Sequence, residues 1–477
     1  MVLALAVMLF GYGGWMLSQA GLDIFPEFSP KQVVIQTEAP GLTAEQAEVQ
    51  VSQPIENALA GLNDLKLIRS QSMQGLSVVT LIFQPDTDIY RNRQIVAERL
   101  GTVDSRLPPG VAAPVINPLS SSSATVMTIG VTSPSRSLMD LRDAVDGTLV
   151  PRLLSVSGVA DVNVFGGDIR QLQIQVDPEA LQAQGVSLAQ VRSAAMRATG
   201  VQGAGFLANR NQQLPITVTG TPETAASLRE VTVQTGPGGR RLQLADIATV
   251  EEAPAPAFGA AQVMGEPGVV MMVIGQYQSN TLTVSRNIEA ALDDLDVVLA
   301  ADDIELHDHL FRPADYIEAS FASIAGHLLV GAGFVILVLL VFLYNWRAAV
   351  ISALAIPLSL LGATILLLAF GVNLNVMVLG GLAIALGEVV DDAIIDTENI
   401  ARRLRENRAL QQPRSFLAVI YDASMEVRGS VVYATFIVVL AFVPLLTLGG
   451  VAGRLFAPLG LAYIVSIQEE PPKAEPV

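Results

Sequence analysis

The chain has 477 residues, of which 51% are hydrophobic and 15% are charged, and its formal net charge is −17 at pH 7. This acidity argues against binding to nucleic acid, because phosphates require a basic surface. The sequence contains no cysteine, which excludes disulfides and thiolate metal sites.

Apolar runs open the chain and fill its last third, whereas residues 21–325 have the mixed charge and turn residues of globular domains. We expect residues 1–20 to form a first transmembrane helix around the run Val2–Leu17. No basic residue precedes this run, so it lacks the n-region of a signal peptide and its start is expected to be clipped. The middle region is long enough for two or more domains with their own cores.

The first part of the middle region, residues 21–115, has the pattern of a small α+β domain. Thr43 is a good N-cap and Gln46 follows three residues later, which is the signature of a capping box. Gly75 lies between two alternating runs and predicts a hairpin. The expected order is strand Gln32–Glu38, helix Thr43–Leu59, strands Lys66–Gln71 and Ser77–Gln84, and helix Asp88–Leu107.

A second round of the same pattern begins after residue 115 and finishes far downstream. We assign residues 116–165 and 263–312 to this second unit and residues 166–262 to an insert, and we expect both units to be split-βαβ arrangements. The second unit is expected to contain strand Ala124–Thr132, helix Leu138–Leu154, strands Ala160–Phe165 and Gln171–Asp177 around Gly166 and Gly167, strand Val269–Gln276, helix Leu282–Leu295 and strand Ile304–Asp308. The insert is expected to contain helix Leu188–Thr199 and strands Leu214–Thr219 and Val231–Gln234.

The last third of the chain carries the long apolar runs Leu328–Tyr344, Ala348–Phe370, Val376–Ile395 and Val431–Leu448. A bilayer core requires about 17–25 apolar residues. Residues 326–467 are therefore predicted to form transmembrane helices two to five and a truncated sixth, because the run Leu455–Ile467 is too short to span. A polar tail, residues 468–477, follows. The predicted fold class is an α+β membrane protein with a transmembrane helix bundle, and the chain is expected to be a fragment of a longer protein or the product of a broken gene.

Basic residues in the short loops indicate the orientation of the bundle. The segment Ala401–Gly429 is rich in arginine, whereas the links Gly371–Asn375 and Gly449–Gly453 have no basic residue. The positive-inside rule places the arginine-rich segment in the cytoplasm. Counting back, residues 21–325 lie on the opposite side, which in a Gram-negative cell is the periplasm.

Acidic residues interrupt the apolar run Val376–Ile395. Asp391 and Asp392 are adjacent there, Glu388 lies one turn before them and Asp396 one turn after. On a helix these four carboxylates fall within an arc of about 140°. An ionised carboxylate at membrane depth costs on the order of 3 kcal/mol unless it is protonated, paired or hydrated. Two adjacent carboxylates cannot both stay ionised at low cost, so the pattern indicates a proton or cation pathway inside a bundle.

Candidate metal ligands are few. His307 and His309 are two residues apart on a predicted strand, so both side chains would lie on one face and form a weak metal-binding candidate. Solvated imidazoles at a strand edge are the better interpretation, because a metal site needs three or four ligands. Met127 and Met271 lie in periodic apolar segments, where packing in a core is favoured over a thioether path for soft metals.

An enzyme is not indicated. Gly236–Gly239 lacks the Gly-Lys-Ser/Thr and the strand–helix context of a phosphate loop, and no nucleophile–base motif is present. The polar groups that look functional lie in an apolar span, as in a transporter. No catalytic residue and no cofactor are therefore expected.

Short motifs recur in a fixed order along the chain. They are Asn57–Leu62, Arg69–Ser70, Gly75–Ser77, Thr87–Tyr90, Arg93–Gln94, Glu98–Leu100, Leu107–Val111, Asn345–Arg347 and Ile356–Leu358. Together with the layout of one span, a large extracytoplasmic region and a cluster of spans, these motifs resemble the N-terminal half of a resistance–nodulation–division (RND) efflux pump, and more closely its heavy-metal efflux branch. The resemblance covers the chain up to about Ile467.

The resemblance implies a proton relay in the fourth span. Asp391 matches the central relay aspartate, and Glu398 with Asn399 match the end of the motif. The sequence departs from the divalent-metal pattern at Ala385, where that pattern has its first aspartate, and at Asp392, which replaces a glycine. An Asp-Asp pair resembles the drug-efflux branch instead. The candidate relay residues are Glu388, Asp391, Asp392, Asp396 and Glu398.

The resemblance also implies partners and leaves three functions open. The preferred one is proton-driven export of heavy-metal cations from the inner membrane by a homotrimer with a periplasmic adaptor and an outer-membrane channel. In the family a lysine from the second half is the counter-ion of the aspartates. That half is missing from this sequence, so it is expected either in another chain or in the rest of a longer one. The alternatives are efflux of hydrophobic or amphiphilic drugs, and a truncated remnant or scaffold without transport.

Overall fold

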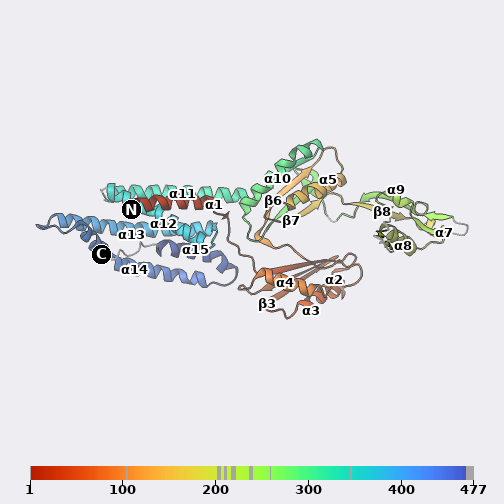
Figure 1. Ribbon diagram of the computed structural model, residues 1–477, viewed down its shortest axis with the longest axis horizontal. Coiled ribbons are helices and arrows are strands. Elements are labelled where there is room, and N and C mark those ends of the chain that lie inside the picture. Colours follow the sequence, from red (N-terminus) through yellow and green to blue (C-terminus); the bar gives the residue numbers. More distant parts are fainter. Residues whose placement is uncertain are drawn as a thin grey trace.

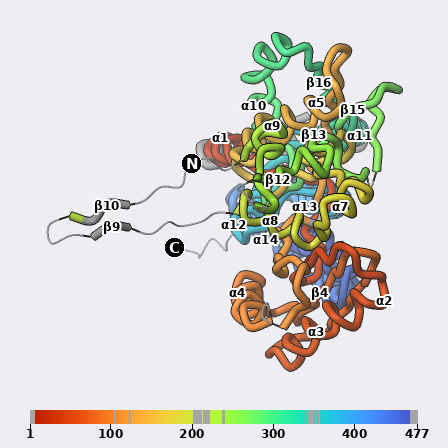
Figure 2. The backbone as a smooth tube through the Cα atoms, turned by 90° about the vertical axis from the view of Figure 1, so that its right-hand side faces the viewer, coloured from red at the N-terminus to blue at the C-terminus, as the bar shows by residue number. Residues whose placement is uncertain are grey.

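The computed structural model describes residues 2–103, 106–200, 206–208, 212–215, 222–235, 240–257, 259–343 and 346–468. Three parts follow one another along its long axis (Figure 1). A bundle of long helices lies at one end, two sheet units lie side by side in the middle, and an outer unit lies at the far end. Figure 2 shows the same two sheet units, with the first below the second.

The helical bundle forms because its segments are apolar and long. Proline interrupts three of these helices without ending them, at Pro357, Pro444 and Pro458. The helices of the bundle in the described residues are α1 (Val2–Gln19), α11 (Pro313–Leu343), α12 (Trp346–Ala369), α13 (Val376–Arg408), α14 (Phe416–Thr447) and α15 (Gly450–Gln468). Three stretches of the described residues are long and apolar enough to cross a membrane: Pro313–Val338, Phe416–Thr447 and Gly450–Ile467.

The last helix of the bundle corrects one expectation. The run Leu455–Ile467 was expected to be too short to span. The helix begins at Gly450, which has a φ of +70°, and its 18 residues up to Ile467 meet the length and hydropathy of a span. The expectation was wrong because it counted only the apolar core and left out the first turn, where small residues and Arg454 still continue the helix.

The first sheet unit is a four-stranded antiparallel sheet covered by helices on one face. Its strand order is β3-β4-β2-β5. Alternate residues of β2 and β4, such as Val33, Ile35, Val79 and Leu81, are fully buried beneath the helices. The elements are β2 (Gln32–Glu38), α2 (Ala44–Ala47), the π-helical segment η1 (Glu48–Ser52), α3 (Gln53–Leu59), β3 (Leu65–Met73), β4 (Leu76–Phe83), α4 (Ile89–Leu100) and β5 (Val115–Ile116).

Local signals explain where these elements begin. The predicted capping box is confirmed, because Thr43 accepts from the Gln46 backbone N–H at 3.3 Å and Gln46 accepts from the Thr43 N–H at 3.1 Å. The hairpin at Gly75 is also confirmed. The helix expected to run to Leu107 ends earlier, at Leu100.

The second sheet unit has five strands, in the order β14-β15-β6-β16 with β7 also paired to β15. Its core contains Met127, Met271, Leu149 and Ile288, all fully buried. The elements are β6 (Ser120–Thr132), α5 (Leu138–Ala144), the π-helical segment η3 (Val145–Leu149), α6 (Val150–Leu154), β7 (Val159–Gly166), β14 (Ala261–Val263), β15 (Glu266–Gln276), α10 (Thr281–Ala301) and β16 (Glu305–Phe311).

The outer unit has its own small core, which includes Val191, Leu228, Leu244 and Ile247. Its elements are β8 (Arg170–Val176), α7 (Pro178–Gln184), α8 (Leu188–Thr199), α9 (Ala225–Arg229), β11 (Thr232–Thr235), β12 (Arg241–Gln243), the 3₁₀ turn η5 (Leu244–Asp246) and β13 (Ala248–Pro254), and β9 (Phe206–Ala208) pairs with β10 (Gln213–Pro215). Figure 1 shows this unit projecting beyond the second sheet unit, away from the bundle.

The structure confirms some of the elements predicted for this unit. The helix expected at Leu188–Thr199 is confirmed. The strand expected at Gln171–Asp177 is present but pairs with β13 and not with the strand that precedes it, so it belongs to the outer unit and not to the second sheet. Most of the strand expected at Leu214–Thr219 lies outside the described residues.

Candidate functional site

Helix α13 positions all five candidate relay residues. The side chain of Asn375 accepts from the Val378 backbone N–H at 3.0 Å and so caps the first turn. Close contact with α15 holds the next turns, because a Cβ on Gly381 would lie 2.4 Å from the Leu459 carbonyl oxygen. Buried Val378 and Leu382 belong to the same apolar cluster as Ala462 of α15. The acidic residues follow directly after this tightly packed segment.

Three of the five acidic residues lie on an inner row. Glu388, Asp392 and Asp396 are spaced four residues apart and are all half-buried. Asp396 Oδ1 is buried and has no hydrogen-bond partner in the described part of the chain. The phenol of Tyr463, on α15, is almost fully buried and interacts electrostatically with Glu388 and Asp392. This row therefore brings carboxyl groups and a phenol together inside the bundle.

The other two acidic residues lie on an uncovered face of α13. Five residues at spacings of three and four are exposed there and form a single row along the helix. We call this row the open stripe, and it consists of Ile384, Gly387, Asp391, Ile395 and Glu398. An exposed aspartate between exposed isoleucines is unusual for a stable surface, because the isoleucines gain nothing from water. The open stripe therefore has the composition of a helix–helix contact face.

The structure thus divides the predicted acidic arc in two. Asp391 and Asp392 are adjacent in sequence but fall on different rows, with Asp391 exposed and Asp392 half-buried. The sequence argument placed Glu388, Asp391, Asp392 and Asp396 on one face about 140° wide. In the structure α15 covers only part of that face.

The end of the apolar part of α13 is fixed to α14 by a buried asparagine. Asn399 Nδ2 donates to the Ala423 carbonyl at 2.7 Å, and Asn399 Oδ1 accepts from Arg402 at 2.7 Å. Arg403 then pairs with Glu426 of α14 at 2.5 Å. A cavity of about 390 Å³, lined partly by these charged groups, lies at this end of the two helices. These contacts set the register of the acidic helix against its neighbour.

Each histidine candidate has a polar neighbour. His307 Nε2 lies 3.0 Å from the Thr132 hydroxyl on the neighbouring strand, and His309 lies 3.6 Å from Asp308 in an exposed pair. The register of β16 shifts between His307 and Phe311, so the two imidazoles are not held on one regular face. No group of three or more His, Asp or Glu side chains arranged to hold a metal occurs within the described residues.

The methionine interpretation is supported. Met127 and Met271 are fully buried in the core of the second sheet unit, where they pack as hydrophobic residues.

Sequence reasoning missed Tyr463, because a single tyrosine in an apolar run gives no sign of what it faces. Its position on the expected truncated helix was the only available signal.

Comparison with known proteins identifies the family. Residues 1–469 match the AcrB/AcrD/AcrF family. The chain belongs to this family of RND transporters. It is 31% identical over 471 residues to the cation efflux system protein CusA of Escherichia coli K12, covering 96% of this chain and 44% of CusA. It is 30% identical over 468 residues to the multidrug resistance protein MdtC of Pectobacterium atrosepticum, covering 98% of this chain and 44% of MdtC.

A solved structure gives the same result for the fold. An X-ray crystal structure of a heavy metal efflux pump matches with a TM-score of 0.85 at 27% identity, covering 98% of this chain and 45% of that one. The fold is therefore that of an RND transporter. The chain spans less than half the length of these relatives and corresponds to their N-terminal half.

Proposed function

We propose that the chain forms the N-terminal half of a proton-driven RND transporter that exports heavy-metal cations. The open stripe on α13 is the observation that carries this proposal. An aspartate exposed in the middle of an apolar helix is costly in a membrane unless another segment covers it and supplies a charge or a proton. A partner helix with a basic side chain would cover the open stripe and complete the relay.

We assign different parts in this relay to the inner row and to the open stripe. Asp391 would face the partner helix and carry the proton, together with Glu398 at the cytoplasmic end. Asp392, Glu388 and Asp396 would form the inner branch beside Tyr463. Each elementary charge that crosses the membrane potential yields about 2.3 kcal/mol per 100 mV, which is the energy available for export.

The proposed setting is the bacterial inner membrane, with the two sheet units and the outer unit in the periplasm. The arginine-rich segment between α13 and α14 supports this orientation. The strand orders, and the helices on one face of each sheet, support two split-βαβ porter subdomains at residues 21–115 and at 116–165 with 263–312. Residues 166–262 would be the docking subdomain, which meets a periplasmic adaptor, an outer-membrane channel and neighbouring subunits of a trimer.

Metal ions are the preferred substrate class. CusA is named as a cation efflux protein and the matching crystal structure is of a heavy metal efflux pump. The likeness to MdtC, and the departures at Ala385 and Asp392, support drug efflux as the second candidate. The motifs Thr87–Tyr90 and Leu107–Val111 lie nearer the substrate path than the relay does. We therefore give them more weight in choosing between metals and drugs.

The test is export by cells that express a pump containing this chain. Asp391→Asn should abolish resistance to zinc, cobalt, nickel, copper or silver, because an amide cannot take up and release the proton. Expression and assembly should stay normal. Asp86→Asn, which neutralises an exposed carboxylate in the loop before α4, is the matched control and should leave resistance unchanged.

Two outcomes would contradict the proposal. Metal resistance that survives Asp391→Asn would remove this residue from the relay. Resistance to dyes and detergents, without resistance to metals, would favour the second candidate.

A further inference from the structure

A two-residue strand joins the relay helix to the second sheet unit. Strand β1 (Leu22–Asp23) pairs in parallel with β17 (Leu374–Asn375), and Asp23 lies opposite Asn375. Asn375 is the N-cap of α13, so β1 pairs with the residue directly before the relay helix. A movement of the start of α13 must therefore displace β1.

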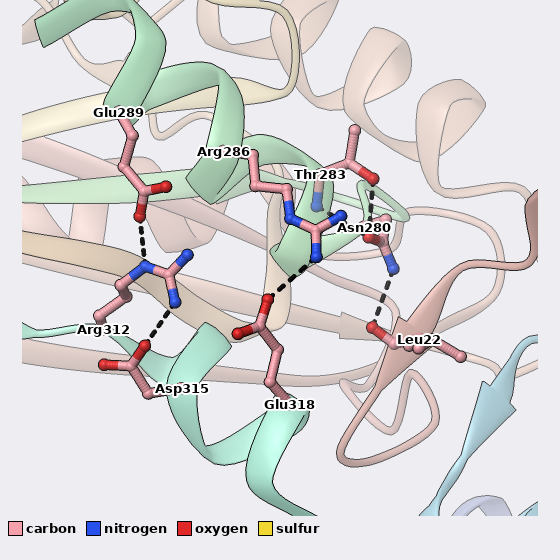
Figure 3. Close-up of polar contacts among 8 residues, drawn as sticks. All are labelled: Leu22, Asn280, Thr283, Arg286, Glu289, Arg312, Asp315 and Glu318. Atoms are coloured by element: carbon pink, nitrogen blue, oxygen red, sulfur yellow. Dashed lines mark hydrogen bonds and ion pairs between the residues drawn. The ribbon is translucent and has the colours of Figure 1, made fainter. Parts of the chain in front are cut away.

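The other side of β1 is held by the start of α10. Asn280 Nδ2 donates to the Leu22 carbonyl at 3.0 Å, while its Oδ1 accepts from the Thr283 N–H at 2.9 Å (Figure 3). The same Nδ2 lies 3.5 Å from Asp23 Oδ2. Asn280 thus caps α10 and binds β1 with one side chain. The fit is close, because a Cβ on Gly21 would lie 3.0 Å from Asn280 Nδ2.

Ion pairs fix α10 to the long helix α11. Arg286 pairs with Glu318 at 3.0 Å, and Arg312 pairs with both Glu289 and Asp315 (Figure 3). Arg312 is almost fully buried and Glu289 is half-buried, so the bond between them is shielded from water, whereas Asp315 and Glu318 are exposed. Helix α10 therefore moves with the start of α11. The contact between β1 and α10 remains free to open, and we call this contact the joint.

Asp23 is the titrating group at this joint. Burial raises the pKa of Asp23 from 3.8 to about 6, although hydrogen bonds from Thr281 and Asn280 lower it and the nearby charge of Glu27 raises it further. Arg454 of α15 lines a cavity that Asp23 also lines, and it donates to the Ser29 carbonyl. The neighbours from β17 and α10 are Asn375, Asn280 and Thr281, none of which titrates.

A cavity beside the joint gives Asp23 access to protons. It has a volume of about 660 Å³ and lies between the ends of α14 and α15 and the chain that follows β1. Its lining includes Asp23, Glu27, Asn375 and Arg454. A volume of this size holds many water molecules, so protons can exchange at Asp23 without passing through the relay.

We propose that Asp23 is a second proton-binding site, at the joint between the relay helix and the second sheet unit, and that its protonation closes this joint. The closed joint buries the carboxyl group, so it binds a proton more tightly than an open, hydrated joint does. By linkage, protonation of Asp23 favours contact between β1 and α10, and ionisation favours their separation. Only the name relay helix for α13 rests on the proposed function.

The test measures the distance between α10 and the link from α12 to β17 as a function of pH. The sequence has no cysteine, so spin labels attach only at introduced sites. Val297 on α10 is 80% exposed and Phe370 after α12 is 71% exposed, and both accept a label without disturbing the core. In the purified 477-residue chain, the ratio of open to closed distances should rise about 25-fold between about pH 4.5 and about pH 7.

Two variants decide whether Asp23 is the group responsible. Asp23→Asn keeps the shape but cannot ionise, so its distances should stay closed at every pH. Thr281→Val removes one hydrogen bond to the carboxylate at nearly constant volume, so the transition should move to higher pH. This second variant keeps the test valid should Asp23→Asn fail to fold.

The matched control is Asp177→Asn. Asp177 caps α7 in the outer unit, far from the joint, and its replacement should leave the transition unchanged. A wild-type distance that does not depend on pH, or an unchanged transition in Asp23→Asn, would overturn the proposal. The measurement needs no export, so its outcome is independent of the test on Asp391.

Discussion

The side chain of Asn399 donates a hydrogen bond to the backbone carbonyl of Ala423, at 2.7 Å, and so fixes the relay helix to α14. Asn399→Ala should destabilise the chain by about 1–3 kcal/mol, because it removes this bond and the one from Arg402. Thermal unfolding in detergent measures the effect. Asn163→Ala, at an exposed position of β7, is the control and should change little. Equal effects of the two substitutions would show that the contact is not stabilising.

Two neighbouring glycines give a matched test of the contact between α13 and α15. Gly381→Ala should cost about 1–3 kcal/mol, because its Cβ would lie 2.4 Å from a backbone oxygen that cannot rotate away. Gly380→Ala meets only Leu459 Cδ1 at 3.9 Å, and should be neutral or stabilise by up to about 1 kcal/mol through helix propensity. The difference in melting temperature between the two variants is the measurement, and its absence would contradict the close contact.

The open stripe predicts a different response at a third glycine. Gly387 has no atom within 4 Å of an added Cβ, so Gly387→Trp should leave the melting temperature of the 477-residue chain nearly unchanged. The same substitution should abolish export by the complete pump, because the indole would occupy the space of the covering helix. Full export in this variant would mean that the open stripe is not a contact face.

Stability should depend on pH through Asp23. Its pKa is raised to about 6, so its contribution to stability is full below pH 3.8 and is lost as pH rises through about 6. Asp23→Asn should therefore be more stable than the wild type by about 1–3 kcal/mol above pH 6 and no more stable near pH 3.8. Melting curves across this pH range test the sign, and a wild type that gains stability between pH 4 and 6 relative to the variant would contradict it.

The outer unit should be removable without loss of the first sheet unit. The two have separate cores, so deletion of residues 170–254 should preserve slow hydrogen exchange in β2 and β4. If residues 166–262 form the docking subdomain, the deletion should also prevent trimer formation on native electrophoresis. Normal trimers would contradict that placement.

Local signals in the sequence predicted many of these elements. The capping box at Thr43 and Gln46, and the helix Leu188–Thr199, were correct because they depend on residues that are neighbours in the chain. Strands β1 and β17 were missed, because two-residue strands have no periodicity and their pairing joins residues about 350 positions apart. The partner of β8 was missed because pairing with a distant strand leaves no local signal in the sequence.

The candidate site was predicted in composition but not in arrangement. The residues on α13 follow from the apolar run and its carboxylates. Which of Asp391 and Asp392 faces a neighbour depends on where α15 crosses, and this is set by Gly381 and Ala462. Asp23 gave no signal in the sequence, because its burial depends on contacts with α10 and β17.

The π-helical segments of the two sheet units occupy equivalent places. In both units a π-helical turn begins six residues before a proline, at Glu48 before Pro54 and at Val145 before Pro151. A π turn is equivalent to one residue inserted into a helix, and such turns are rare. The same irregularity at the same distance from a proline means that the two helices accommodate an extra residue in the same way. This local likeness persists although the second unit is interrupted by the outer unit.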